Sequence, residues 1–258
     1  MNSKTLILTS TINISPIKSL KITNAEQRFC EYKKSLKKWL LNQNVFNKII
    51  FVENSGFNLD NLAQYVDNLV HEKEIQFVSF ISDDDSNNKD LGFGELESID
   101  RAINSSKSNI DYFFKCTGRV YIKNITKLKL NNYDIQCNLN RNLVYTNSVF
   151  FGCSSDIYKK YLYPKMLENV INNNHIEQGL AMGIHNAILN GAKWSPIYPI
   201  PYIDGYSGTK GNHYMKRYPA PIRLLINLTN YIHYKDSKTS YKDGRHYYDV
   251  TKRLLQNK

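Results

Sequence analysis

Hydrophobic positions in the first half of the chain alternate between two spacings. Four short apolar runs are typical of strands buried in a sheet: Thr5–Thr9, Lys48–Val52, Ile75–Ile81 and Tyr112–Phe114. Three segments between them repeat apolar residues every three to four positions, the spacing of one helix face: Ala25–Leu41, Asn58–Val70 and Leu96–Ile103. Strands that alternate with helices in this way predict an α/β fold with a mostly parallel central sheet flanked by helices.

The second half of the chain has a different pattern. Leu143–Gly152 predicts a strand pair or one bent strand, and Trp194–Tyr206, rich in proline and tyrosine, predicts an extended segment. Helical spacing returns in three places: Ser155–Leu167, Ile176–Leu189 and Ala220–Tyr234. Without an internal repeat or a clear linker, we expect one domain over residues 1–215. Residues 216–258 would form a C-terminal helical extension, either packed in the same globule or in contact with a membrane surface.

Composition agrees with a folded protein of this size. The chain has 258 residues, 41% of them hydrophobic and 12% aromatic, which excludes a disordered chain. No apolar run approaches the ~18 residues that a membrane span needs. The first residues, MNSKTLILTSTIN, read as a first strand rather than a signal peptide, so we expect a cytoplasmic protein. The four cysteines form no CxxC pair, which predicts reduced thiols.

The net charge of +11 favours a polyanion, an anionic membrane surface or a phosphate-bearing ligand as partner. The same charge also fits lysines that only solvate the surface. A basic nucleic-acid-binding module without catalytic activity is therefore one hypothesis, although the basic residues are dispersed and no nucleic-acid-binding motif is present.

The order of the elements points to a family. A strand, a helix, the turn ENSG, a third strand, a glycine-containing loop, a helix and a fourth strand with a polar end resemble the GT-A fold of nucleotide-sugar glycosyltransferases. Within residues 5–215, GFGELESIDRAI followed by DYFFKCTGRVYI resembles bacterial enzymes that build capsule or lipopolysaccharide O-antigen chains. The resemblance implies a GT-A-like (Rossmann-like) fold and an inverting, hexosyltransferase-like enzyme.

That resemblance also implies substrates. The donor would be a nucleotide diphosphate sugar, UDP-linked, and the acceptor a hydroxyl of a growing surface glycan, free or lipid-linked. Nucleic acid is not expected as a partner. The protein would work in the cytoplasm, with peripheral contact to the inner face of the cell membrane as an open alternative. In the family, the ends of the first two strands hold the nucleotide, which here are Thr9, Ser10, Thr11, Glu53 and Asn54. Ordinary turn and capping roles are the alternative for these residues.

The end of the fourth strand carries cations where relatives carry metal-binding carboxylates. Lys115, Thr117, Gly118 and Arg119 stand there. Arg119, and Lys115 after it, would stabilise the departing diphosphate, and Gly118 would let the backbone approach the ligand. A structural salt bridge of Arg119 is the alternative, and Lys115 could also point to the far face of the sheet.

No metal is therefore required in this interpretation, with manganese or magnesium as the alternative. The acidic triplet that contains Asp83 and Asp85 is only a weak metal candidate. It follows the third strand, whereas the family's motif follows the next one.

Three further stretches complete the expected site. Lys89, Gly94 and Glu95 lie where a helix begins and would shape the donor pocket. Glu177, at the start of a later helix, would act as the base that deprotonates the acceptor hydroxyl, or would only favour the helix N-terminus. A polar loop would close over the diphosphate, or remain a surface turn; its candidates are Ser207, Gly208, Thr209, Lys210 and Tyr214.

Overall fold

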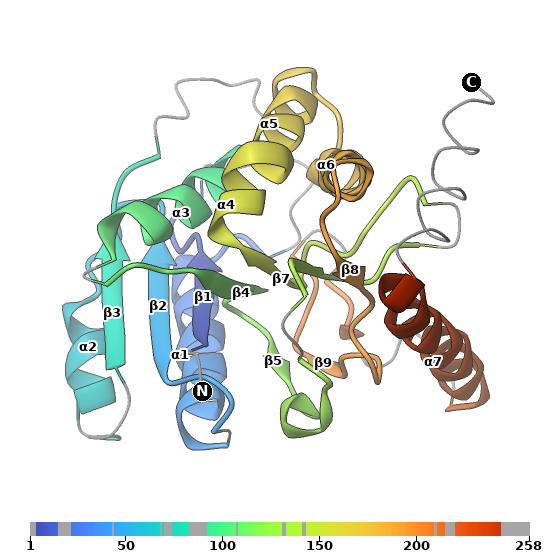
Figure 1. Cartoon of the computed structure of the whole chain (residues 1–258). Coiled ribbons are helices and arrows are strands. Elements are labelled where there is room, and N and C mark those ends of the chain that lie inside the picture. Colours follow the sequence, from blue (N-terminus) through green and yellow to red (C-terminus); the bar gives the residue numbers. More distant parts are fainter. Residues whose placement is uncertain are drawn as a thin grey trace.

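The computed structural model describes residues 4–14, 22–42, 44–67, 69, 74–82, 92–106, 108–130, 133–140, 143–208, 211–214 and 220–243. Its centre is a seven-stranded sheet (Figure 1). In spatial order the strands are β3 (Glu74–Ser79), β2 (Lys48–Glu53), β1 (Thr5–Ser10), β4 (Tyr112–Thr117), β7 (Phe150–Ser154), β6 (Ile135–Gln136) and β8 (Trp194–Ser195). The first four are parallel, and β7 is antiparallel to both its neighbours. This confirms the expected α/β class with a mostly parallel central sheet flanked by helices.

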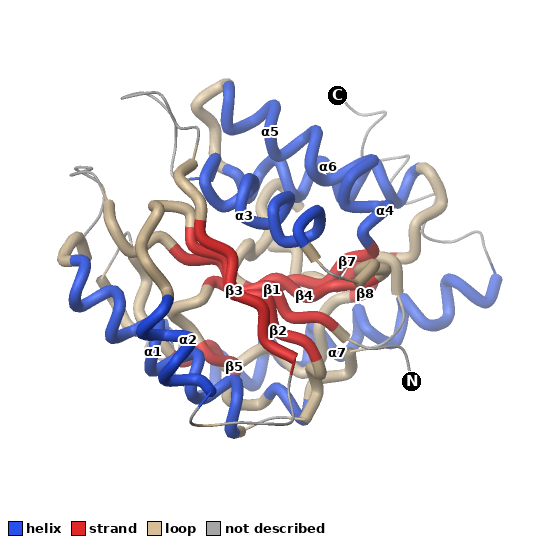
Figure 2. Tube along the Cα trace, turned by 90° about the vertical axis from the view of Figure 1, so that its left-hand side faces the viewer, coloured by secondary structure: helices blue, strands red, loops and turns tan. Residues whose placement is uncertain are grey.

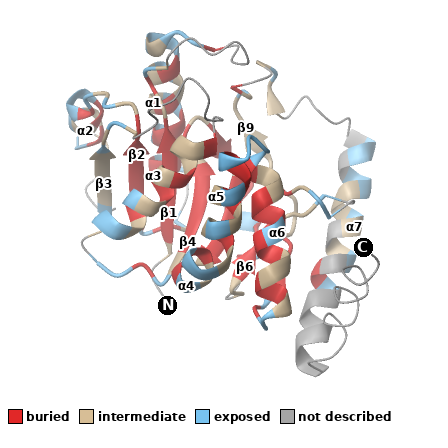
Figure 3. Ribbon diagram, turned by 90° about the horizontal axis from the view of Figure 1, so that it is seen from above, coloured by how far each residue is buried: buried red, intermediate tan, exposed pale blue. Residues whose placement is uncertain are grey.

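Helices cover both faces of the sheet (Figure 2). One face carries α1 (Ala25–Leu41) and α2 (Asp60–Asp67). The other carries α3 (Gly92–Ser105), α4 (Ser155–Ile157), a π-helical turn (Tyr158–Leu162), α5 (Tyr163–Ile171) and α6 (Ile176–Leu189). Because both faces are covered, β1 and β2 are buried throughout (Figure 3). That double burial is why these strands read as unbroken apolar runs.

The helix α1 shows how local sequence specifies an element. It begins after Asn24, whose side chain accepts a hydrogen bond of 2.8 Å from the backbone N–H of Gln27 and so caps the helix. Its apolar stripe, which includes Tyr32, Leu36 and Trp39, is buried against the sheet. This stripe places the polar face of α1 toward the outside and toward the candidate site described below.

The C-terminal helix α7 (Ala220–Asp243) lies beyond the β8 end of the sheet (Figure 1). The backbone N–H of Ile200 donates to Oδ1 of Asn227 at 2.9 Å, and the rings of Tyr198 and Tyr234 stack with centroids 5.5 Å apart. These contacts join one side of α7 to the extended segment. Along the described residues, none of the helices combines the length and apolar character that crossing a membrane requires.

Several boundaries differ from the sequence prediction. The segment Leu143–Gly152 was expected to be a strand pair or a bent strand, but only β7 (Phe150–Ser154) is regular, and the residues before it form turns and one isolated bridge. Two short strands were missed, β6 and β5 (Tyr121–Ile122); β5 pairs with β9 (Ile203–Asp204) in a separate two-stranded sheet. All four cysteines are free.

Candidate active site

The carboxyl ends of β1, β2 and β4 meet at one edge of the sheet, because these strands are parallel neighbours. Ser10 is in register with Glu53, and Thr9 is in register with Thr117. The fold therefore brings together the two strand ends expected to hold a nucleotide and the stretch expected to hold its phosphates. Ligands of open α/β sheets bind beyond this edge.

Glu53 lies at this edge with its side chain fully buried. One carboxylate oxygen accepts from the backbone N–H of Ile12 at 2.9 Å. The other accepts from the N–H groups of Ser55 and Phe57 at 3.0 and 2.8 Å. The carboxylate thus ties together the loops that follow β1 and β2. Its predicted contact with a nucleotide is untested, and any such contact would compete with these bonds.

The loop after β1 is held in a similar way. The hydroxyl of Ser10 donates to the carbonyl of Val52 at 2.9 Å. The backbone N–H of Thr11 donates to the Tyr32 hydroxyl at 3.0 Å, and its carbonyl accepts from Nε of Arg28 at 2.7 Å. These bonds make the end of β1 rigid, which suits a preorganised binding surface; nucleotide binding by these residues stays a prediction.

Gly118 is required for packing between strands. Its N–H donates to the carbonyl of Thr9 at 2.8 Å. A Cβ at this position would lie 2.9 Å from that carbonyl oxygen and 3.2 Å from the Tyr32 ring. The close approach that we expected toward a ligand is therefore made, in this structure, toward the end of β1.

Asn54 and Gly94 lie in contact where β2 meets α3. Asn54 is almost completely buried, and a Cβ on Gly94 would collide with its side-chain nitrogen. Its Oδ1 has no hydrogen-bond partner among the described residues. A buried acceptor without a partner is costly unless a ligand or water completes it. Asn54 therefore remains a candidate for ligand contact.

Lys115 is the fully buried cation of the site. Its Nζ lies 2.7 Å from Oε1 of Glu95, donates to the carbonyl of Ser148 at 2.8 Å and to Oγ1 of Thr117 at 3.3 Å. Two of these contacts are hydrogen bonds, and the third is an ion pair that balances the charge of the ammonium group within the protein. A phosphate at Lys115 would have to displace one of these partners, and the predicted phosphate contact stays untested.

Glu177, the candidate base, belongs to the same cluster. It lies in the first turn of α6, and its Oε1 accepts from the hydroxyl of Ser148 at 3.2 Å. Glu95 lies in the first turn of α3. Burial raises the pKa of Glu95, the charge and hydrogen bond of Lys115 oppose this, and the charge of Glu177 adds to the increase. The fold thus gathers Glu95, Lys115 and Glu177 from three elements.

Arg119 lies just beyond β4, with a side chain that is 9% exposed. Its closest ion-pair partner in the described part of the chain is Glu31, whose Oε2 lies 3.9 Å from Nη1, beyond hydrogen-bond distance. Nε and Nη1 are buried and have no hydrogen-bond partner there. A buried guanidinium with open donors is unusual in a folded protein, and it is the strongest signal of a ligand site on this edge.

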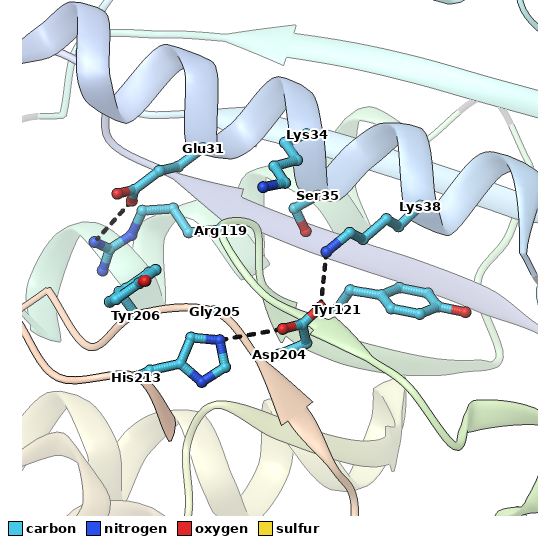
Figure 4. Close-up of a pocket in the computed structure, with 10 residues that line it drawn as sticks. All are labelled: Glu31, Lys34, Ser35, Lys38, Arg119, Tyr121, Asp204, Gly205, Tyr206 and His213. Atoms are coloured by element: carbon cyan, nitrogen blue, oxygen red, sulfur yellow. Dashed lines mark hydrogen bonds and ion pairs between the residues drawn. The ribbon is translucent and has the colours of Figure 1, made fainter. Parts of the chain in front are cut away.

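Arg119 lines a cavity of about 160 Å³ (Figure 4). The helix α1 provides Glu31, Lys34 and Lys38; the end of β9 provides Asp204, and the loop after it provides Gly205, Tyr206 and His213. Gly208 packs against the guanidinium, and any side chain there would collide with Nη2. The loop can approach Arg119 because residue 208 is a glycine.

Asp204 joins the loop to α1 (Figure 4). Its carboxylate lies 2.7 Å from Nζ of Lys38, 3.1 Å from Nε2 of His213 and 3.8 Å from Nζ of Lys123. Burial alone would raise the pKa of Asp204, but the hydrogen bond and charge of Lys38, with Lys123 and His213, outweigh it and lower the pKa. The wall of the cavity is therefore charged and ion-paired at neutral pH.

Tyr214 connects the two groups of residues. Burial raises the pKa of its hydroxyl, while a hydrogen bond with Ser207 and the charge of Arg119 oppose this and the charge of Glu95 adds to it. The charges of Arg119 and Glu95 therefore both act on this hydroxyl. The cavity around Arg119 and the cluster around Lys115 are adjacent parts of one site.

Some expected site residues lie outside the described residues: Asp83, Asp85, Lys89, Thr209 and Lys210. Their roles remain predictions. Other residues were missed by the sequence reasoning. Ser148, which lies between Lys115 and Glu177, had no signal because it comes from an irregular segment. In the sequence, Lys34 and Lys38 were indistinguishable from ordinary surface lysines on the polar face of α1.

The donor set at the end of β4 does not fit a divalent metal ion. Such ions take carboxylate, carbonyl and water oxygens, whereas this position holds Lys115, Thr117 and Arg119. Across the described ranges, no three His, Cys, Asp or Glu side chains gather into a metal-binding group.

Comparison with known proteins identifies no family from sequence. No protein-family model matches the chain, and no curated protein matches it. Among solved structures, the chain is similar to the galactosyltransferase LgtC in complex with donor and acceptor sugar analogues, with 9% identity, a TM-score of 0.47, and coverage of 87% of this chain and 95% of that one.

Two other solved structures show the same level of similarity. A nucleotide-diphospho-sugar transferase from Desulfovibrio desulfuricans G20, so named provisionally, has 10% identity and a TM-score of 0.43 over 91% of this chain and 99% of its own. Residues 1–349 of TarS from S. aureus have 12% identity and a TM-score of 0.46 over 78% and 59%. At such low identity, the similarity concerns the path of the chain and says nothing of individual residues.

Proposed function

We propose that this protein is a glycosyltransferase. It moves a sugar from a nucleotide diphosphate sugar, UDP-linked, to a hydroxyl of a growing surface polysaccharide such as capsule or O-antigen, with inversion at the anomeric carbon. The observation that carries the proposal is the buried guanidinium of Arg119 next to Gly208, with two nitrogens that have no hydrogen-bond partner among the described residues. A diphosphate offers the charge and the acceptor oxygens that this group lacks.

The chemistry follows from the two adjacent parts of the site. The carboxylate of Glu177 takes the proton of the acceptor hydroxyl, and the acceptor oxygen forms a bond to the anomeric carbon. The bond from that carbon to the donor diphosphate breaks, and its electron pair leaves with the diphosphate. Arg119 balances the charge that grows there. Because the cation is part of the chain, the reaction in this proposal needs no metal cofactor.

A thermal-shift series tests the function. We expect UDP or a UDP-sugar at about 100 times its Kd to stabilise the protein by roughly 2.7 kcal/mol, which raises the Tm by about 5–10 °C. Manganese or a chelator should leave this shift unchanged. No stabilisation by any member of a panel of nucleotides and nucleotide sugars would count against the transferase. Loss of the shift with chelator would contradict the metal-free chemistry.

The described residues offer no observation in favour of the nucleic-acid-binding alternative. Lys38 and Lys115 are ion-paired within the protein, and basic residues bind a nucleic-acid backbone only when they cluster on an open face. The same thermal-shift series separates the two functions, because an oligonucleotide should give no salt-sensitive stabilisation if the protein is a transferase.

We also propose that α7 rests on an anionic membrane surface at the inner face of the cell membrane, where a lipid-linked acceptor would be found. Along its length, α7 exposes several large apolar residues: Ile222, Leu224, Leu225, Leu228 and Ile232. Two of them, Leu224 and Leu228, line a groove with Tyr198 and Tyr231. Apolar residues on a helix within a basic chain favour the interface of anionic lipids.

Flotation tests the membrane contact. The full chain should float with vesicles that contain phosphatidylglycerol, and the double variant Leu225→Glu, Ile232→Glu should remain at the bottom of the gradient. Both side chains are more than half exposed, so the substitutions should leave the fold intact. Equal flotation of the two proteins would refute the contact.

A further inference from the structure

We propose that Glu95, Lys115 and Glu177 act as one unit, in which Lys115 is a positioning residue that holds two carboxylates beside the acceptor. This inference rests on the proposed function and deepens it. It gives Glu95 and Lys115 a task on the acceptor side of the site, in place of the donor contacts expected from the sequence.

The position of Lys115 supports this task. Its side chain is 0% exposed, and its Nζ is within 3.3 Å of acceptors on α3, on β4 and on the segment before β7. Burying an ammonium group costs several kcal/mol unless its partners are well placed. An apolar side chain would fill the same strand position without that cost. The ion pair is therefore better explained by what it holds in place than by stability.

A continuous set of contacts connects Lys115 with Glu177. Nζ of Lys115 holds the backbone carbonyl of Ser148, and the hydroxyl of the same residue holds Oε1 of Glu177. The backbone N–H of Thr146 donates to the carbonyl of Glu177 at 3.4 Å. The orientation of the Glu177 carboxylate therefore depends on a residue that Lys115 holds directly.

The two carboxylates affect each other. Each lies in the first turn of a helix, where the positive end of the helix dipole favours a negative charge. Burial raises the pKa of Glu95 most, the charge and hydrogen bond of Lys115 oppose this, and the charge of Glu177 raises the pKa further. The ionisation of Glu95 therefore reports on both partners at once.

Other titratable groups near Glu95 stay neutral over the range in which a carboxylate titrates. These groups are Tyr158 on the π-helical turn, Cys116 on β4 and Tyr214 in the C-terminal loop. Burial raises the pKa of each of them, that of Cys116 to about 12. Among the described residues, Lys115 and Glu177 are then the neighbours whose charges act on Glu95.

The first arm of the experiment needs no turnover. Glutamate labelled with carbon-13 at the carboxyl group allows Glu95 to be titrated by NMR, with the signal assigned through Glu95→Gln. In Lys115→Met the midpoint of Glu95 should rise by about 1–3 pH units, and in Lys115→Arg it should stay near that of the wild type. In Glu177→Gln the midpoint should fall. An unchanged midpoint in both Lys115→Met and Glu177→Gln would overturn the proposal.

The second arm measures turnover with the UDP-sugar that stabilises the protein most. Lys115→Met should lower kcat about 100-fold, the cost of a catalytic group displaced by about 1 Å. The thermal shift with UDP should remain, because donor binding does not need Lys115. Lys115→Arg should recover most of kcat. Full turnover in Lys115→Met would overturn the proposal.

Lys48 offers a matched control. It is also a buried lysine on a strand of the same sheet, and its Nζ lies 2.8 Å from Oε1 of Glu74, but it is at the amino end of β2, opposite the site. Lys48→Met should cost stability in a similar way and leave kcat and the Glu95 midpoint unchanged. An equal loss of kcat in Lys48→Met would mean that both lysines act through stability alone, against the proposal.

If the protein is not a glycosyltransferase, the experiments give a different set of results. If the wild type turns over no UDP-sugar and binds no nucleotide, the transferase is refuted. The unit of Glu95, Lys115 and Glu177 is then judged by the NMR arm, where opposite shifts of the Glu95 midpoint in Lys115→Met and Glu177→Gln support it, and their absence refutes it.

Discussion

Replacing Arg119 with alanine should lower kcat/KM for sugar transfer by about 100- to 1000-fold, the usual effect of removing one preorganised group that stabilises a developing negative charge. The Tm should stay close to that of the wild type. The guanidinium is 9% exposed, and two of its nitrogens have no hydrogen-bond partner in the described part of the chain, so the fold gains little from it. Kinetics with the stabilising UDP-sugar and a melting curve check both expectations.

A surface arginine serves as the control for Arg119. Arg101 on α3 is 51% exposed and lies 3.7 Å from Glu97, so Arg101→Ala removes the same charge away from the cavity. It should keep kcat/KM within the error of the wild type. An Arg119→Ala protein that folds and transfers sugar at the normal rate would contradict the assignment of Arg119 to the diphosphate.

Replacing Glu177 with glutamine should lower kcat by about 100- to 10,000-fold, the range of a general base, and leave the thermal shift with UDP intact. The amide keeps the size of the side chain and can still accept the 3.2 Å hydrogen bond from Ser148, so the structure should be preserved. What is lost is the capacity to take a proton. Single-turnover measurements with saturating donor separate this loss from slow product release.

The control for Glu177 is Glu168→Gln. Glu168 is 52% exposed on α5, pairs with Lys165 at 2.6 Å, and undergoes the same change of charge outside the site. Full activity is expected for this variant. If Glu177→Gln and Glu168→Gln behaved alike, the base would have to be sought elsewhere, and Glu95 would be the next candidate because it lies in the same cluster.

Much of the fold could be predicted because the spacing of apolar residues within short segments specifies the helices and strands. The helix Ile176–Leu189 was predicted with the boundaries that the structure has, since its apolar spacing and its turns are set by neighbouring residues. The strand β7 was less predictable. Its pairing with β4 and β6 is long-range, and the irregular segment before it carries apolar residues that look like a strand.

The candidate site, too, was predictable from the sequence only in part. Sequence order placed Lys115 and Arg119 together at the end of β4 as two cations for one diphosphate. The structure separates them: Lys115 is paired with Glu95 and bonded to Ser148, whereas two nitrogens of Arg119 have no hydrogen-bond partner in the part of the chain that the structure describes. This difference depends on which loops pack against each side chain, and the sequence around β4 contains no information on it.

The sequence by itself determined the alternation of strands and helices, and therefore the edge at which the ends of β1, β2 and β4 meet, because hydrophobic period and parallel pairing are properties of short segments. Only the tertiary structure decided which polar groups at that edge already have hydrogen-bond partners within the protein. Glu53 and Lys115 are hydrogen-bonded to residues distant in the sequence, whereas Nε and Nη1 of the buried Arg119 have no hydrogen-bond partner among the described residues. Burial removes water from all three, so the partners that the fold supplies or withholds decide which of them remains able to bind a ligand.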